Sequence, residues 1–170
     1  MTSRVFNVLF LCTGNSARSI IAESVLNHLG DGRHRAFSAG SFPGGKVNPL
    51  VLAFLAQQGI PTTEARSKSW DEFASPGSVA LDFVITVCDD AAGEACPVWP
   101  GQPITAHWGV EDPARFMDAP DRARIVIHEV FHTLYRRIQL FLSLPVSSLD
   151  RLALTAAVRE IGAEKQLAKQ

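Results

Sequence analysis

The sequence predicts an α/β fold built on a parallel sheet, and three observations support this class. Short apolar runs typical of strands alternate with longer stretches typical of helices. The run 81–87 is almost continuously apolar, as expected for a strand covered on both faces. With 170 residues, 46% hydrophobic and 19% charged, the chain is long enough for one well-filled core and short for two.

The elements can be placed in chain order. Strands are expected at 5–11, 34–39, 81–87 and 103–107, and helices at 18–29, 48–58, 69–74, 121–142 and 148–161. In the longest helix, apolar side chains recur at spacings of four and three, which marks a face that packs on the core. These are Ile127, Phe131, Leu134, Ile138 and Phe141. Pro145 ends this helix, and Gly162 is expected to end the next one, leaving 163–170 as a frayed tail.

The composition argues against several classes of partner. A formal net charge of −1 with interspersed signs provides no basic surface for nucleic acid or an anionic membrane. The run 5–11 is far shorter than the roughly 20 residues that cross a bilayer, and no cleavable leader precedes it, so a cytoplasmic protein is expected. Three cysteines, an odd number, fit a reducing compartment and nucleophilic or redox use better than structural disulfides.

The segment after the first strand constrains the function most tightly. It reads Cys12-Thr13-Gly14-Asn15-Ser16-Ala17-Arg18-Ser19. The helix that begins near Arg18 points its amides toward the sulfur of Cys12, and Gly14 lets the backbone turn close to a ligand. The guanidinium of Arg18 suits two oxygens of a tetrahedral oxyanion. Arg18 and the Ser19 hydroxyl favour the thiolate, so a pKa of roughly 3.5 to 7.5 is expected for Cys12.

A lone cysteine at a strand end is more often a small buried hydrophobic residue. Here the arginine and the strand-loop-helix context favour a nucleophile, and the segment resembles the signature of the low-molecular-weight protein tyrosine phosphatase superfamily. That superfamily includes the thioredoxin-coupled arsenate reductases. The resemblance covers roughly residues 4–143 and implies a flavodoxin-like three-layer sandwich. We therefore expect a catalytic domain over 1–145 and a helical extension over 146–170, which caps the sheet's helices, joins a partner subunit or does neither.

The other two cysteines distinguish the branches of this superfamily. Cys88 follows the strand 81–87, so it is expected at the same edge of the sheet as Cys12. A small-residue segment with Gly93 separates it from Cys96 and could bring the two thiols together; two unrelated buried cysteines are the alternative. The segments Val-Cys-Asp-Asp and Ala-Cys-Pro resemble the redox pair of the arsenate reductases. Their spacing is one residue longer than in the thioredoxin-coupled branch, which leaves the electron donor open.

A candidate general acid follows the last expected strand. Residues 107–113 read His-Trp-Gly-Val-Glu-Asp-Pro, and Asp112 can protonate a leaving oxygen, a contribution of typically 10² to 10⁴ in rate. Asp-Pro alone signals only a turn. The whole segment resembles the acid loop of the reductases, and the tyrosine pair of many family phosphatases is replaced by Ala114-Arg115-Phe116-Met117. A small inorganic substrate fits that replacement.

Two further patterns concern metal ions. Asn15, Glu23 and Ser38 align with positions that help bind potassium in some arsenate reductases, but Lys68 replaces an acidic ligand there, so we expect no required potassium and read Asn15 as a brace of the loop. The string His128-Glu129-Val130-Phe131-His132 matches the zinc-protease pattern H-E-x-x-H. Both histidines are expected to face solvent, with no third ligand evident nearby. No cofactor and no metal site are therefore expected.

The resemblance implies a cytoplasmic arsenate reductase that serves arsenic detoxification. Cys12 would attack arsenate, Asp112 would protonate the departing oxygen, and Cys88 and then Cys96 would carry the disulfide to a thioredoxin or glutaredoxin-type reductant. Phosphate and sulfate would compete as oxyanions. Two alternatives remain open: a phosphomonoester hydrolase with Cys88 and Cys96 as bystanders, and a non-catalytic oxyanion-binding module.

Overall fold

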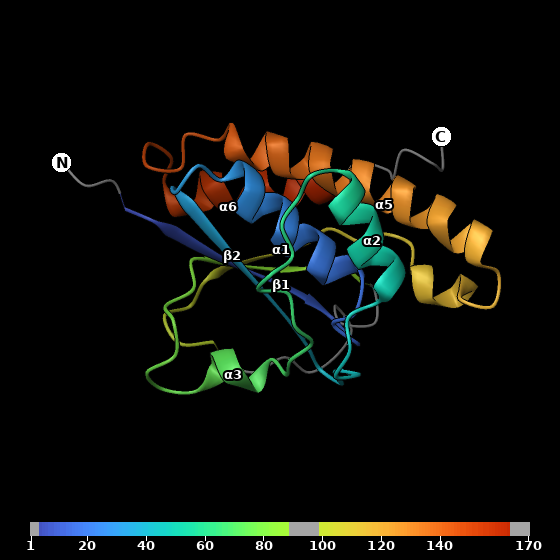
Figure 1. Cartoon of the computed structure of the whole chain (residues 1–170). Coiled ribbons are helices and arrows are strands. Elements are labelled where there is room, and N and C mark those ends of the chain that lie inside the picture. Colours follow the sequence, from blue (N-terminus) through green and yellow to red (C-terminus); the bar gives the residue numbers. More distant parts are fainter. Residues whose placement is uncertain (1–3, 89–98, 164–170) are drawn as a thin grey trace.

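A computed structural model of the chain describes residues 4–88 and 99–163, and within these ranges four parallel strands form one sheet flanked by helices (Figure 1). The strands are β1 (Phe6–Cys12), β2 (His34–Gly40), β3 (Phe83–Thr86) and β4 (Ile104–His107). The helices are α1 (Arg18–Leu29), α2 (Pro49–Gln57), α3 (Asp71–Ala74), α5 (Pro120–Leu142) and α6 (Arg151–Ala163), with a 3₁₀ helix η1 at Pro113–Phe116. The predicted α/β class with a parallel sheet is confirmed.

The register of the sheet brings the carboxyl ends of all four strands to one edge. The strand order is β2-β1-β3-β4, and every pair is parallel. Cys12 lies opposite Gly40, Leu11 opposite Thr86, and Thr86 opposite His107. Segments that follow these strands therefore meet at this edge, where ligands of open α/β sheets bind.

Helices cover both faces of the sheet. Figure 1 shows α1, α2, α5 and α6 on one side and the short α3 on the other. The larger hydrophobic cluster joins alternate residues of the strands to α1, α5 and α6, and the smaller one packs Leu9, Leu11 and Val84 against Phe73 of α3. Within the described ranges, no helix combines the length and the apolar character that crossing a bilayer requires.

Two details differ from the sequence-based expectations. The chain forms η1 directly after Asp112, because the Asp112 carboxylate accepts a hydrogen bond from the amide of Ala114 at 3.0 Å and Pro113 occupies the first turn. The prediction that Gly162 ends a helix is wrong. It lies inside α6, where a Cβ would overlap the carbonyl oxygen of His107, so this glycine permits a close approach between helix and sheet.

His34, the first residue of β2, makes stability depend on pH. Its ring packs between Phe6 and Phe141, with centroids 5.7 and 5.4 Å away. Burial lowers the pKa of His34; Arg33 acts in the same direction and Asp82 opposes it. Below its ordinary pKa of about 6.5 the unfolded chain therefore binds a proton that the folded chain resists, and stability falls as pH drops.

We expect His34→Phe to reduce this loss of stability. The measurement is the urea midpoint of wild type and variant at pH 7.5 and pH 5. The difference between the two pH values should be smaller in the variant, because the phenyl ring keeps the packing without a titrating nitrogen. Equal differences in the two proteins would show that His34 does not contribute to the acid sensitivity.

Candidate active site

Cys12 is the last residue of β1 and is buried, with 3% of its surface exposed. Its sulfur lies 2.9 Å from the Ser19 hydroxyl and accepts a hydrogen bond from the amide of Asn15 at 3.2 Å. The apolar strand thus delivers the thiol into a loop that curls around it and ends at the first turn of α1. The N-cap residue of that helix is Ala17, whose methyl group cannot accept a hydrogen bond from the first-turn amides.

The electrostatic balance at Cys12 differs from the expectation of a lowered pKa. Burial raises the pKa of the Cys12 thiol, and Cys88 adds to this, whereas the Ser19 hydrogen bonds and Arg18 lower it. The result is a pKa above its usual value. The thiol form is therefore favoured more strongly than the sequence predicts, because a thiolate loses its hydration when it is buried.

Asn15 braces the loop in a left-handed backbone conformation, with φ of 48°. Its side-chain amide donates to the Ser19 hydroxyl at 2.8 Å, and its side-chain oxygen accepts from the amide of Lys68 at 2.8 Å. Asn15 thus holds the loop as expected, because an asparagine side chain can stabilise such a turn. A Cβ on Gly14 would meet only the Ser16 hydroxyl, at an ordinary 3.7 Å.

Gly40 is a site residue that the sequence does not reveal. It ends β2 opposite Cys12, and a Cβ there would overlap the carbonyl oxygen of Thr13 and lie 3.0 Å from the amide nitrogen of Asn15. The oxyanion loop therefore packs directly on the backbone of this glycine. The available signal was a glycine at a strand end, which by itself indicates only a turn.

We expect Gly40→Ala to lower the free energy of unfolding by roughly 1–3 kcal/mol, the usual effect of overpacking, and to weaken phosphate binding because the loop must move. Urea unfolding and calorimetric titration with phosphate measure the two effects. Gly44→Ala is the matched control, since nothing lies within 4 Å of a Cβ there. Equal stability and phosphate affinity in the two variants would contradict the prediction.

Arg18 and Asp112 meet across the sheet edge. The Arg18 side chain is 12% exposed; it donates to the carbonyl oxygen of Val110 at 3.2 Å and lies 3.3 Å from the Asp112 carboxylate, which is 33% exposed. The loop after β4 is therefore tied to the loop after β1. A guanidinium has five N–H donors, so it can contact Asp112 and still present donors to an oxyanion.

Cys88 lies at the same edge, just beyond β3, and is 1% exposed. Its sulfur is 3.6 Å from the Thr13 hydroxyl, and its charge adds to the raised pKa of Cys12. Cys88 therefore lies beside the loop that holds Cys12. Cys96 lies outside the described residues.

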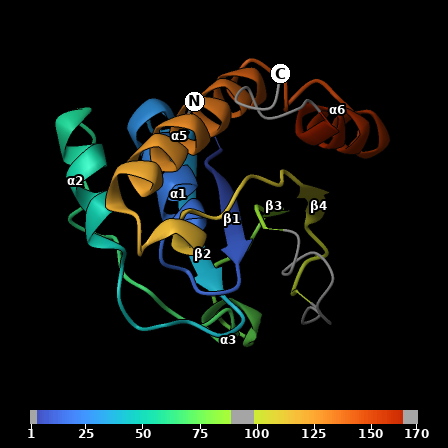
Figure 2. The same ribbon diagram turned by 90° about the vertical axis from the view of Figure 1, so that its right-hand side faces the viewer.

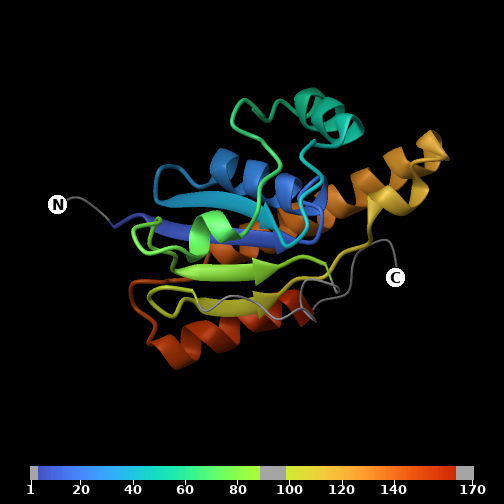
Figure 3. The same ribbon diagram turned by 90° about the horizontal axis from the view of Figure 1, so that it is seen from below.

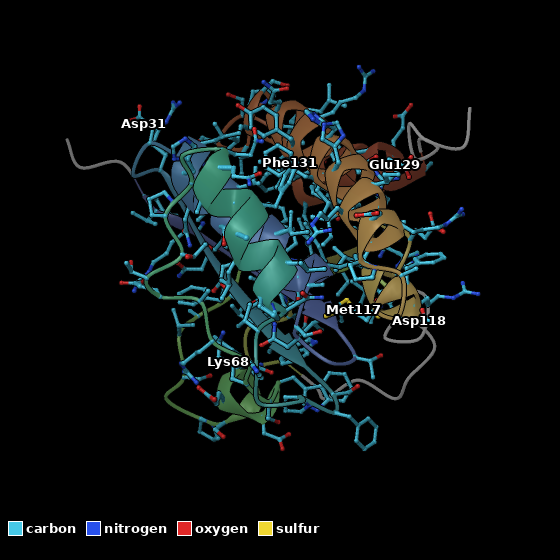
Figure 4. The ribbon with its side chains drawn as sticks, turned by 45° about the vertical axis from the view of Figure 1, so that its right-hand side comes forward. Asp31, Lys68, Met117, Asp118, Glu129 and Phe131 are labelled. Atoms are coloured by element: carbon cyan, nitrogen blue, oxygen red, sulfur yellow. The ribbon has the colours of Figure 1, made fainter. Side chains whose placement is uncertain are left out.

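Lys68 occupies the position beside Glu23 and Ser38. Its ammonium is 4.0 Å from the Glu23 carboxylate and donates to the carbonyl of Arg66 at 3.0 Å, while the Ser38 hydroxyl donates to Glu23 at 2.9 Å. Burial lowers the pKa of Lys68 and raises that of Glu23. Figure 4 shows Lys68 beside α3. An ammonium on the chain thus supplies the positive charge beside the buried Glu23 carboxylate.

We expect Lys68→Met to lower the free energy of unfolding by about 3–5 kcal/mol, because it leaves the Glu23 carboxylate buried without its cation. The urea midpoint measures this, and wild type should give the same midpoint in sodium and in potassium buffers. Lys46→Met, at an exposed lysine, is the control. Equal midpoints for the two variants, or a wild-type midpoint that rises with potassium, would contradict the prediction.

Asn48 connects two loops of the site. Asn48, the N-cap of α2, donates from its backbone to the carbonyl of Ser16 at 2.9 Å and from its side chain to the sulfur of Met117 at 3.3 Å. It thus links the oxyanion loop to the end of the acid loop; Met117 is labelled in Figure 4.

The exposed His128 and His132 lie on α5 with their Nε2 atoms 3.2 Å apart. Within the described ranges, no cluster of three or more possible metal ligands occurs.

A parallel sheet that places a cysteine in a loop closed by an arginine, with a carboxylate opposite, defines an enzyme with a cysteine nucleophile for oxyanions or their esters. The family model described as low molecular weight phosphotyrosine protein phosphatase matches residues 7–151, and the chain belongs to this family. The predicted resemblance is therefore confirmed.

Similar proteins include several arsenate reductases. Those of Bacillus licheniformis and Shouchella clausii are 35% and 33% identical over 135 and 134 residues, which are 79% of this chain and 93% of each relative. A solved arsenate reductase from Archaeoglobus fulgidus superposes with a TM-score of 0.59 at 27% identity, over 78% of this chain and 98% of that one. A thioredoxin-dependent arsenate reductase from Corynebacterium glutamicum gives 0.56 at 28% identity, over 82% and 65%.

Proposed function

We propose that the protein reduces arsenate to arsenite with three thiols, Cys12, Cys88 and Cys96, and a dithiol reductant of the thioredoxin or glutaredoxin type. The observation that carries this proposal is that Cys88 lies beside the Cys12 loop, in contact with Thr13. A hydrolase needs one thiol at this edge, because water regenerates it. A reductase needs a second thiol within reach of the first.

The first step uses the oxyanion loop. The Cys12 thiolate attacks arsenic while loop amides and the Arg18 guanidinium hold the arsenate oxygens. Asp112 donates a proton to the departing hydroxyl group, which leaves as water, and a Cys12–S–As(V) adduct remains. Because burial raises the pKa of Cys12, the donors at Ser19 and Asn15 are needed to sustain the thiolate when it attacks.

The second step transfers two electrons. The Cys88 thiolate attacks the Cys12 sulfur, a disulfide forms between them, and the electron pair of the S–As bond stays on arsenic, which leaves as arsenite. Cys96 then attacks Cys88 to give a Cys88–Cys96 disulfide and release the Cys12 thiolate. A dithiol of the thioredoxin or glutaredoxin type reduces this disulfide and is itself oxidised.

Phosphomonoester hydrolysis is the second candidate. It uses Cys12, Arg18 and Asp112 in the same positions, and the family match is consistent with it. Water would then hydrolyse a phosphocysteine, and Cys88 and Cys96 would have no role in turnover.

One set of variants separates the candidates. We expect wild type to show arsenate-dependent NADPH oxidation with thioredoxin and its reductase, and Cys88→Ser and Cys96→Ser to lose multiple turnover. Aryl-phosphate hydrolysis serves as the control, because both variants keep the oxyanion loop. If both variants reduce arsenate like wild type, the relay is wrong. If wild type hydrolyses aryl phosphates rapidly and does not reduce arsenate, the protein is a phosphomonoester hydrolase. A second assay, in which glutathione and glutaredoxin replace thioredoxin, tests the electron donor.

A thiol count without reductant tests the order of the relay. The reduced, denatured chain has three titratable thiols. After a single exposure to arsenate, wild type should retain one thiol per chain and release one arsenite. Cys96→Ser should release one arsenite and retain none, because Cys12 and Cys88 form the disulfide. Retention of all thiols in wild type would refute the proposed chemistry.

A further inference from the structure

Helix α6 packs against β4 at the point where the acid loop begins. Figure 2 shows α6 beside α5 above β4, and in Figure 3 it runs along the β4 side of the sheet. Leu154, Val158 and Ile161 are buried in the same cluster as the strands, while Leu152 is 82% exposed on the outer side of the helix. The family match ends at residue 151, so nearly all of α6 lies beyond it.

The first contact joins α6 to Trp108, the residue after β4. The indole ring is fully buried, and its N–H donates to the carbonyl oxygen of Val158 at 3.0 Å. That carbonyl belongs to the helix backbone, so the hydrogen bond depends on the path of α6 rather than on one of its side chains. The backbone amide of Trp108 is also fixed, by the carbonyl of Thr86 at 2.7 Å.

The second contact is made by Gly162. A Cβ at this position would overlap the His107 carbonyl oxygen and lie 2.5 Å from Cδ1 of Trp108. The helix backbone therefore rests directly on the two residues that open the acid loop. A glycine at this position is explained by the close approach, because a residue with a Cβ would not fit.

The next residues of the loop are held by α5, by the segment after β3 and by Arg18. Arg137 of α5 is 2% exposed and donates to the carbonyl oxygen of Gly109 at 3.1 Å. The amide of Val110 donates to the carbonyl of Val87 at 3.1 Å, and its carbonyl accepts from Arg18. Trp108, Gly109 and Val110 are thus each anchored, and Asp112 follows two residues later.

We propose that α6 is a positioning element for the general acid: it fixes Trp108 and thereby sets the place of Asp112 opposite Cys12. This inference rests on the proposed role of Asp112 as the acid. Small displacements of a catalytic group lower rates steeply, with 1 Å costing about 10²-fold in some cases. Contacts far from the reacting atoms can therefore control the proton-transfer step.

The test uses Gly162→Ala and Trp108→Phe in the full chain, with Leu152→Ala as the control on the exposed side of α6. Activity is measured with arsenate, with phenyl phosphate and with 2,4-dinitrophenyl phosphate, whose leaving group needs no proton. We expect Gly162→Ala to lower the first two rates about tenfold or more and the third less than twofold. Trp108→Phe keeps an aromatic ring of smaller size and removes the N–H donor; it should also lower the rates with arsenate and phenyl phosphate more than the rate with 2,4-dinitrophenyl phosphate, but by a smaller factor than Gly162→Ala.

A second measurement does not depend on turnover. Amide hydrogen exchange over 107–118 should be faster in Gly162→Ala than in the control, with exchange over 12–19 unchanged. The variant is compared with Leu152→Ala in two quantities: the amide exchange over 107–118, and the ratio of the phenyl phosphate rate to the 2,4-dinitrophenyl phosphate rate. If both match, α6 does not position the acid. Equal losses with all three substrates would indicate general destabilisation and would also overturn the inference. A wild type with no arsenate turnover would contradict the proposed function alone, because aryl phosphates and exchange still report on the loop.

Discussion

Replacing Arg18 by lysine should lower kcat/KM for arsenate by about 10²–10³-fold, the usual effect of removing a donor that stabilises developing charge. Lysine keeps the positive charge but lacks the planar fork that holds two oxygens at once. It also loses the geometry that now links Val110 and Asp112 to one side chain. The rate should therefore fall although the net charge is unchanged.

Steady-state kinetics with arsenate and with an aryl phosphate measure this effect, because both substrates use the same loop. Arg115→Lys is the matched control, since Arg115 is exposed and belongs to η1 rather than to the oxyanion loop. A near-normal kcat/KM for Arg18→Lys with both substrates would mean that charge alone suffices, and the fork would have no role.

Asp112→Asn should lower kcat for arsenate by about 10²–10⁴-fold, because the amide cannot donate the proton that the leaving hydroxyl needs. Asparagine retains an oxygen that can accept from the amide of Ala114, so η1 should keep its N-cap. Asp112→Ala removes the cap as well. We expect it to reduce activity similarly and to lose roughly 1 kcal/mol of stability in addition.

The comparison of the two Asp112 variants separates chemistry from loop structure. Kinetics and urea unfolding are measured on both, with Asp118→Asn as the control at an exposed carboxylate just beyond η1. If Asp112→Asn retains wild-type kcat while Asp112→Ala loses it, the carboxylate acts as a cap and another group supplies the proton.

Most of the fold could be predicted because its elements are encoded locally. The longest helix, α5, runs from Pro120 to Leu142 against an expected 121–142, since its apolar periodicity is strong, Pro120 occupies its first turn and Pro145 follows its end. Strand β3 is shorter than expected, at Phe83–Thr86, because an apolar run shows that a segment is buried but not where pairing stops. The role of Gly162 was missed because a glycine in a helical pattern does not show that the helix packs directly on a strand end.

The main residues of the candidate site could also be predicted from the sequence, but their supporting contacts could not. Cys12 and Arg18 share one short loop, so their spacing carries the information, and α/β topology places Cys88 and Asp112 at the same edge. Gly40 and Asn48 were missed because their roles arise from contacts with the distant Thr13, Ser16 and Met117. The raised pKa of Cys12 was missed because the extent of burial is a tertiary property.

The register between β1 and β3 sets the relative positions of Cys12 and Cys88 along the sheet edge. Leu11 and Thr86 lie on the same rung of the sheet, so Cys12 stands one residue past that rung and Cys88 two. An insertion within β3 would shift Cys88 along the sheet edge relative to Cys12, because the register pairs each residue of β3 with one residue of β1.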